Sequence, residues 1–181
     1  MPTPPSTDNY VIGKGVMSIA EWSGGAPGAY IDMGNCPVVD LEPTVERLDH
    51  FSSRAELREK DKSIIVEVGY NLTFDCDEIA ARNLKRFLLG DITGGNIVYA
   101  MQNPNQEYAL KFVTDNPVGP NYTWEFWKAT LAPNGPMSLI GEEWMVMSFL
   151  AEGLADRANH PESPFITVTG ITTTTTSTTT T

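Results

Sequence analysis

Residues 64–74 read Ile64-Ile65-Val66-Glu67-Val68-Gly69-Tyr70-Asn71-Leu72-Thr73-Phe74 and form the clearest strand pattern in the sequence. Every second residue from Ile64 to Phe74 is apolar or aromatic, whereas Glu67, Asn71 and Thr73 fall on the other face. Because successive side chains of a strand point to opposite faces, this pattern predicts a strand with one buried and one wetter face.

The spacing changes to that of a helix directly after this strand. Asp75 and Glu78 stand at the N-cap and N3 positions of a capping box, and Gly90 offers a stop. The apolar residues between them recur at helical intervals: Ala80, Leu84, Phe87 and Leu88. The sequence therefore predicts one helix over residues 75–89. Its solvent side would carry an i,i+4 pair of Glu78 with Arg82, beside Lys85 and Arg86.

Short strand patterns occupy most of the remaining sequence, separated by turns rich in Asn, Pro and Gly. They cover residues 10–19, 30–35, 38–45, 97–101, 107–114, 122–131, 143–151 and 165–169. Gly13 and Gly15 interrupt the first pattern, as expected where another backbone approaches closely. Many short strands with a single helix predict a mainly β fold of two packed antiparallel sheets, a β-sandwich or barrel, with one flanking helix. This domain would span residues 10–170, between an N-terminal arm (1–9) and a threonine-rich tail (171–181).

Composition excludes several classes of protein. The 181 residues suit one domain, and 12 basic against 23 acidic residues give a net charge of −11. A protein that grips nucleic acid by neutralising phosphates needs a basic face, so we expect DNA to be repelled. Cys36 and Cys76 are too few for a disulfide framework, which favours a reduced, cytoplasmic origin. No signal-peptide pattern or membrane-spanning run is present, so we expect no membrane insertion.

None of the polar clusters predicts a catalytic, cofactor or metal site. Asp75, Asp77 and Glu78 lack the loop spacing of a calcium site and suit helix capping better. His50 and His160 are far apart in the sequence, without neighbours at zinc-ligand spacing, which favours surface or turn roles. Short glycine pairs fall short of a phosphate-binding loop. The two cysteines are more typical of small buried hydrophobes than of reactive thiols. We therefore expect no cofactor and no enzymatic activity.

Aromatic residues concentrate between positions 122 and 144. Alternation places Tyr122, Trp124 and Phe126 on one face, as expected of core residues. Trp127 falls on the opposite face, where it could meet a neighbouring subunit. An alternative hypothesis is a ligand-binding β-sandwich, such as a carbohydrate-binding module that uses Trp127 and Trp144.

Residues 46–62 form a long charged segment between two strand regions. They hold five of the twelve basic residues, interleaved with acids and with Leu48, Phe51 and Leu57. A solvated loop is the simplest interpretation. However, a structureless loop of this length is uncommon inside a compact domain and is usually functional or disordered. We predict a mobile loop that becomes ordered against a partner.

Three stretches carry a resemblance to a known family: residues 41–54 (Leu-Glu-Pro-Thr-Val-Glu-Arg-Leu-Asp-His-Phe-Ser-Ser-Arg), residues 58–62 (Arg-Glu-Lys-Asp-Lys) and residues 77–84 (Asp-Glu-Ile-Ala-Ala-Arg-Asn-Leu). They closely resemble the tail tube proteins of bacteriophages with long, non-contractile tails, the siphophage type. The match covers roughly residues 34–90, about a third of the chain. In that family two antiparallel sheets pack with a flanking helix, six copies form a ring, and stacked rings make the tube through which DNA is ejected into the host.

The resemblance also implies partners and contact residues. The family's long inter-strand loop reaches the next subunit or ring. By resemblance, and with Trp127 from the alternation above, contacts between copies would involve Arg47, Leu48, Asp49, His50, Phe51, Arg54, Leu57, Arg58, Lys60, Lys62 and Trp127. The implied partners are further copies of the chain, a tape measure protein in the lumen during assembly, other tail proteins at the tube ends, and viral DNA in transit without specific binding. The implied location is the virion tail, after synthesis in the host cytoplasm. Where some relatives carry an added immunoglobulin-like domain, this sequence has its threonine-rich tail.

Overall fold

The computed structural model describes residues 6–54, 56–94 and 96–171, so residues 1–5 of the predicted N-terminal arm and 172–181 of the predicted tail lie outside it. The described chain is mainly β, with one short 3-10 turn, η1 (Thr7–Asn9), and one α-helix, α1 (Ala81–Phe87). Its strands are β1 (Gly15–Ser23), β2 (Ala26–Pro27), β3 (Ile31–Asp32), β4 (Val39–Ser52), β5 (Glu59–Cys76), β6 (Asp91–Thr93), β7 (Ile97–Tyr99), β8 (Glu107–Thr114), β9 (Asn121–Pro133), β10 (Met147–Gly153) and β11 (Ile166–Ile171).

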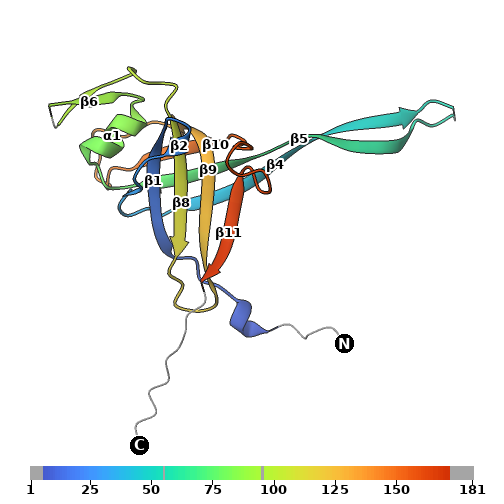
Figure 1. Ribbon diagram of the computed structural model, residues 1–181, viewed down its shortest axis with the longest axis horizontal. Coiled ribbons are helices and arrows are strands. Elements are labelled where there is room, and N and C mark those ends of the chain that lie inside the picture. The colour runs from blue at the N-terminus through green and yellow to red at the C-terminus, as the bar shows by residue number, and fades with distance from the viewer. Residues whose placement is uncertain (1–5, 55, 95, 172–181) are drawn as a thin grey trace, which may run out of the picture.

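Two antiparallel sheets account for these strands, which confirms the predicted fold class. The large sheet has nine strands in the order β2-β1-β8-β9-β10-β5-β4, with β3 on β1 and β11 on β9. Strands β6 and β7 form the small sheet. Strand β9 changes neighbour along its length, from β11 at Phe126 to β10 at Pro133. The large sheet bends there, so that β4 and β5 cross β1, β8 and β9 at a steep angle (Figure 1).

The core lies between these two parts of the large sheet. Its largest fully buried side chains come from both parts: Met17, Ile19, Leu72, Phe74, Leu110, Phe126, Met147 and Phe149. The rings of Phe74 and Phe149 stack with their centres 5.0 Å apart, and Phe87 of α1 meets Phe149 edge-on at 5.7 Å. The helix thus closes one side of the core.

The helix is shorter than the predicted span of 75–89. Asp75 belongs to β5, where it accepts a 2.6 Å hydrogen bond from Ser148 Oγ, and the N-cap residue is Ala80, without a side-chain cap. The sheet ladder therefore outcompetes the predicted capping box. The expected pair of Arg82 with Glu78 is present at 2.8 Å. The expectation that Arg86 faces solvent is wrong, because its side chain is buried.

The other corrections concern strand ends. Strand β1 begins at Gly15 rather than residue 10, and β10 begins at Met147 rather than residue 143. A side chain at Gly15 would overlap the Val113 carbonyl, which confirms the predicted close approach there, whereas Gly13 meets nothing within 4 Å. The short strand β6 was not predicted, because three residues give too little periodicity.

Candidate assembly surface

A two-stranded arm projects from one side of the molecule (Figure 1). We define the arm as the described residues of the range 45–68. They comprise the end of β4, the residues 53, 54 and 56–58, which we call the arm turn, and the beginning of β5; the other described residues form the body. Strand β10 pairs with β5 only between Asn71 and Cys76, so these arm residues pair with each other alone. At about 3.3 Å per residue, the run from Glu59 to Val68 extends roughly 30 Å.

The arm corrects the prediction of a long loop over residues 46–62. The chain is paired strand up to Ser52 and again from Glu59 onward, and the described residues between them belong to no strand or helix. The prediction was wrong because a strand pattern is recognised by its buried face. The arm has no buried face, so its charged and apolar residues follow no simple alternation.

Ion pairs link the two strands of the arm. Lys60 Nζ lies 2.7 Å from Asp49 Oδ2, and Ser63 Oγ donates a 2.6 Å hydrogen bond to Asp49 Oδ1. The hydrogen bond from Lys60, and then that from Ser63, lower the pKa of the Asp49 carboxyl. His50 Nδ1 lies 2.6 Å from Asp61 Oδ1. These exposed contacts hold the register of the hairpin but contribute little to the stability of the body.

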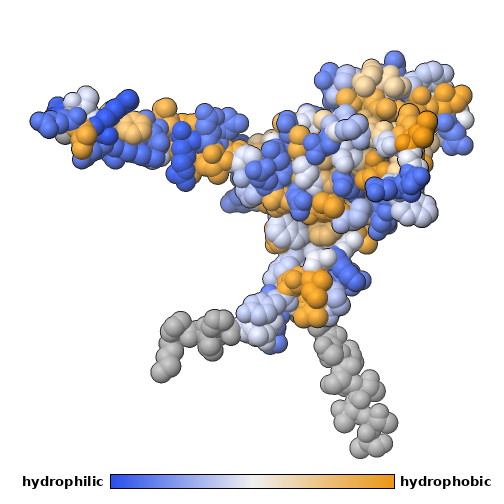
Figure 2. Space-filling model, turned by 180° about the vertical axis from the view of Figure 1, so that it is seen from behind, coloured by the Kyte–Doolittle hydropathy of each residue, from blue (hydrophilic) through white to orange (hydrophobic). Residues whose placement is uncertain are grey.

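Apolar side chains are exposed along the whole arm. They are Val45, Leu48, Phe51, Leu57, Ile64, Ile65, Val66 and Val68. A register shift between Glu46 and Arg47 separates the Val45–Val68 pair from the Leu48–Ile64 pair. Because such a shift exchanges the faces of one strand, apolar residues lie on both faces of the arm. Figure 2 shows hydrophobic residues interspersed among hydrophilic ones along it.

This exposure also corrects the interpretation of residues 64–74 as a strand with one buried face. Burial begins at Tyr70 and continues through Leu72, Phe74 and Cys76, whereas Val66 is 54% exposed. Strand β5 thus packs in the core at its C-terminal end and exposes apolar side chains to solvent at its N-terminal end. An isolated two-stranded hairpin is marginal in water, and large exposed apolar patches are typical of interaction sites.

Ten of the eleven residues predicted to contact other copies lie on the arm, and Trp127 lies on the body. Within the described part of the chain, Arg47, Arg54, Arg58 and Lys62 form no salt bridge. The guanidinium of Arg58 lies over the Phe51 ring, 4.8 Å from its centre. The sequence interpretation missed the exposed apolar residues of β5, because their alternation is the same signal that a core strand gives.

Trp127 is less accessible than its position in the sequence suggests. Its indole stacks on the His160 imidazole, with ring centres 3.6 Å apart and planes 6° apart. Its Nε1 is buried and has no hydrogen-bond partner among the described residues. One face of the Trp127 ring is therefore covered by His160, which reduces the ring surface that a sugar or another protein could contact.

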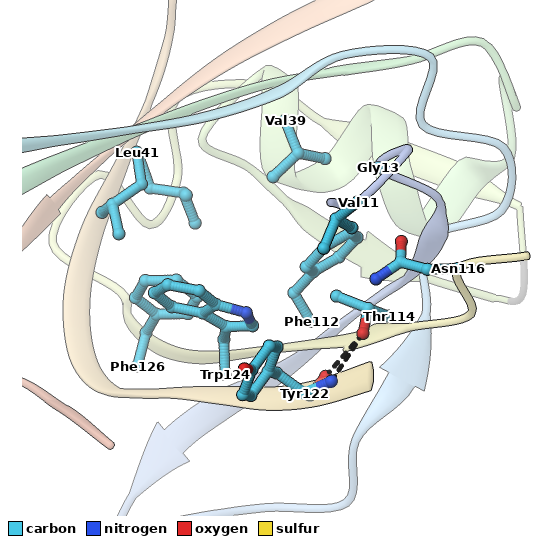
Figure 3. A pocket seen from close by; sticks show the side chains of 11 residues that line it. Val11, Gly13, Val39, Leu41, Phe112, Thr114, Asn116, Tyr122, Trp124 and Phe126 are labelled. Atoms are coloured by element: carbon cyan, nitrogen blue, oxygen red, sulfur yellow. Dashed lines mark hydrogen bonds between the residues drawn. The ribbon is translucent and has the colours of Figure 1, made fainter. Parts of the chain in front are cut away.

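An apolar pocket of about 350 Å³ opens at one end of the core. Figure 3 shows Val39 and Leu41 of β4 on one side and Phe112, Trp124 and Phe126 on the other. Phe126 is a buried core residue and Trp124 packs against the core, which agrees with the prediction that both face inward. Few polar side chains line the pocket, and two of them are engaged within the chain: Thr114 Oγ1 donates to the Tyr122 carbonyl at 3.1 Å, and Asn116 Nδ2 donates to the Pro120 carbonyl at 3.0 Å.

The titratable groups of the described residues were compared with the requirements of a metal site and of a reactive thiol. In the described residues no group of three or more His, Cys, Asp or Glu side chains is placed to hold a metal ion. Cys36 and Cys76 are both free thiols. Their mutual hydrogen bond, and then burial, raise the pKa of the Cys36 thiol, while Cys76 Sγ donates to the Met33 carbonyl at 3.1 Å. Of the helices that the structure describes, none has the length and apolar character needed to cross a membrane.

Comparison with known proteins adds one family. Residues 10–96 match a family model described as a protein of unknown function, UCP028589. The matched residues include the arm and helix α1 and end directly before β7 begins at Ile97. No curated protein matches the sequence.

Proposed function

We propose that this protein is a structural subunit that assembles with copies of itself, and specifically a siphophage-type tail tube protein whose six-membered rings stack into the conduit for DNA ejection. The observation that carries the proposal is the arm, whose described strand residues expose apolar side chains on both faces and pair only with each other. The resemblance of residues 41–54, 58–62 and 77–84 to tail tube proteins supplies the type of assembly.

The exposed apolar side chains of the arm would stabilise a complex with a partner more than they stabilise their own subunit. Fully burying a completely exposed Val or Leu side chain is worth about 1.5–3 kcal/mol, and each of the partly exposed arm side chains would contribute roughly half of that. Eight such side chains along the arm therefore offer a large driving force once a second surface covers them. Covering both faces requires two surfaces, which suits an arm held between neighbouring copies in a polymer.

Charge distribution supports contact between the arm of one copy and the body of another. Residues 46–62 contain five basic and five acidic residues, so the other residues carry the whole net charge of −11. Two acidic bodies repel each other, whereas a neutral arm, whose arginines form no salt bridge with any described residue, can approach an acidic body without that penalty. The same acidic excess would keep DNA from adhering to the wall of a tube.

Native mass measurement of the wild-type protein and an arm-shortened variant tests the proposal. Thr44 and Gly69 are cross-strand partners, so an Asn-Gly turn can join them in place of the arm. We expect rings or polymers from the wild type, and a folded monomer with a similar melting temperature from the variant. A wild type that stays monomeric over a wide concentration range, or a variant that assembles normally, would contradict the proposal.

The apolar pocket favours a second candidate, a ligand-binding β-sandwich. Its volume of about 350 Å³ lies within the range of small-molecule sites. Its apolar wall suits a hydrocarbon chain, whereas a sugar would find few free hydrogen-bonding groups. Saturable binding of a fatty acid to a protein that remains monomeric would favour this candidate over assembly.

A further inference from the structure

The loop between β9 and β10 carries a second exposed apolar cluster. We name residues 134–146 the β9–β10 loop. Ile140 is 96% exposed and Trp144 is 94% exposed, and Leu139 is exposed beside them. Large side chains exposed this fully are typical of interaction sites, and Trp is the residue type most enriched in binding hot spots.

The loop is also acidic. Glu142 and Glu143 precede Trp144, both are exposed, and the loop contains no Lys or Arg. Neither glutamate forms a salt bridge with any residue that the structure describes. A partner that satisfies this surface would bring apolar side chains together with unpaired cations.

The arm of the same chain has this chemistry. Its turn presents Leu57, which is 75% exposed, between Arg54 and Arg58. Arg58 already lies over an aromatic ring, that of Phe51. A Trp ring binds cations more strongly than a Phe ring, so Trp144 offers an arginine a better surface of the same kind.

The two surfaces stand at opposite ends of one strand. Met147, which follows the β9–β10 loop, pairs with Cys76 at the end of β5, whereas the arm turn precedes Glu59 at its beginning. At about 3.3 Å per residue, these ends of β5 lie roughly 55 Å apart. The arm therefore cannot reach the loop of its own copy, but it can reach that of another. Figure 2 shows hydrophobic surface also at the end of the body away from the arm.

We propose that the β9–β10 loop of one copy receives the arm turn of the next. Ile140 and Leu139 pack against Leu57, while Trp144 and the two glutamates bind Arg54 and Arg58. Because two different surfaces meet, the contact is head-to-tail and repeats from copy to copy instead of closing a pair. The inference rests on the proposed self-assembly and names the surface that the arm would use.

Charge reversal tests this contact in two variants. The loop variant is Glu142→Lys with Glu143→Lys, and the turn variant is Arg54→Glu with Arg58→Glu. Each places like charges across the proposed contact, so each alone should raise the critical concentration for assembly about ten-fold or more. A mixture of the two should assemble again, since the loop of each variant then faces the turn of the other with opposite charge.

The control for the loop variant is Glu152→Lys with Glu162→Lys, which changes the net charge by the same amount as the loop variant at two other exposed positions. It should assemble like the wild type, and all variants should keep the wild-type melting temperature. Normal assembly of the loop variant, equal loss in the control, or no recovery in the mixture would overturn the inference while leaving the proposed self-assembly intact. A wild type that does not assemble would instead overturn the proposed function itself.

Discussion

The aromatic ring of Tyr70 lies against the α-carbon of Gly153, at the point where β5 leaves β10 and becomes the arm. Tyr70 also packs on Phe126, with ring centres 5.4 Å apart, and meets Phe165 edge-on at 6.4 Å. Burial raises the pKa of its hydroxyl, which donates a long hydrogen bond of 3.4 Å to the Lys128 carbonyl. Tyr70 is thus the anchor that fixes the base of a projecting arm to the core.

Gly153→Ala should destabilise the subunit by about 1–3 kcal/mol, because the added methyl group overlaps the buried Tyr70 ring and overpacks the site. Urea denaturation of the free subunit measures this change. Gly13→Ala is the matched control, since a methyl group there meets nothing within 4 Å. Equal stability of the two variants would show that the arm base is not packed as described.

Two substitutions in β5 should separate stability from assembly. Phe74→Ala removes a fully buried ring and should cost about 3–5 kcal/mol of folding free energy. Val66→Ser changes an exposed arm residue and should alter folding by less than about 0.5 kcal/mol while weakening assembly. Thermal unfolding and sedimentation of both variants check this. A Val66→Ser protein that assembles like the wild type would contradict the role given to the arm.

Hydrogen exchange should divide β5 at Tyr70. In the free subunit, arm amides between Glu59 and Val68 should exchange faster than those between Asn71 and Cys76, which lie between two strands. Assembly should slow the arm amides and leave the others nearly unchanged. Arm amides that exchange at the same slow rate in monomer and polymer would show that assembly adds no protection to the arm, and so that no partner covers it.

The pKa of Asp49 should depend on Lys60. Because the hydrogen bonds from Lys60 and Ser63 lower this pKa below 3.8, the carboxylate stabilises the arm fully above pH 3.8, and this stabilisation is lost as the pH falls through the lower folded value. NMR titration should show the Asp49 pKa rising towards 3.8 in Lys60→Met. Lys62→Met should leave it unchanged, because Lys62 forms no salt bridge with Asp49 in the described structure. If the Asp49 pKa rose in Lys62→Met and stayed the same in Lys60→Met, Lys62 rather than Lys60 would be the cause of the shift.

The sequence predicted the fold class and most strands because these depend on local patterns. Strand β8, for example, has the bounds that the alternation of residues 107–114 predicted. It failed where tertiary contacts decide. Asp75 has the residue type of a helix cap, but the pairing of Ser148 with Asp75 places it in the sheet. The arm was predicted at the right place in the sequence, but as a loop, and Val66 was predicted to be buried. Alternation shows that a strand has an apolar face, but it does not show whether that face packs against protein or lies in solvent.

Electron microscopy of the concentrated wild-type protein in negative stain would show the proposed assembly itself. We expect six-membered rings and stacked tubes with an open central channel, and their loss when the arm is replaced by the Asn-Gly turn between Thr44 and Gly69. Fields of dispersed single particles of subunit size, at concentrations where the exposed arm should be covered by neighbours, would contradict it.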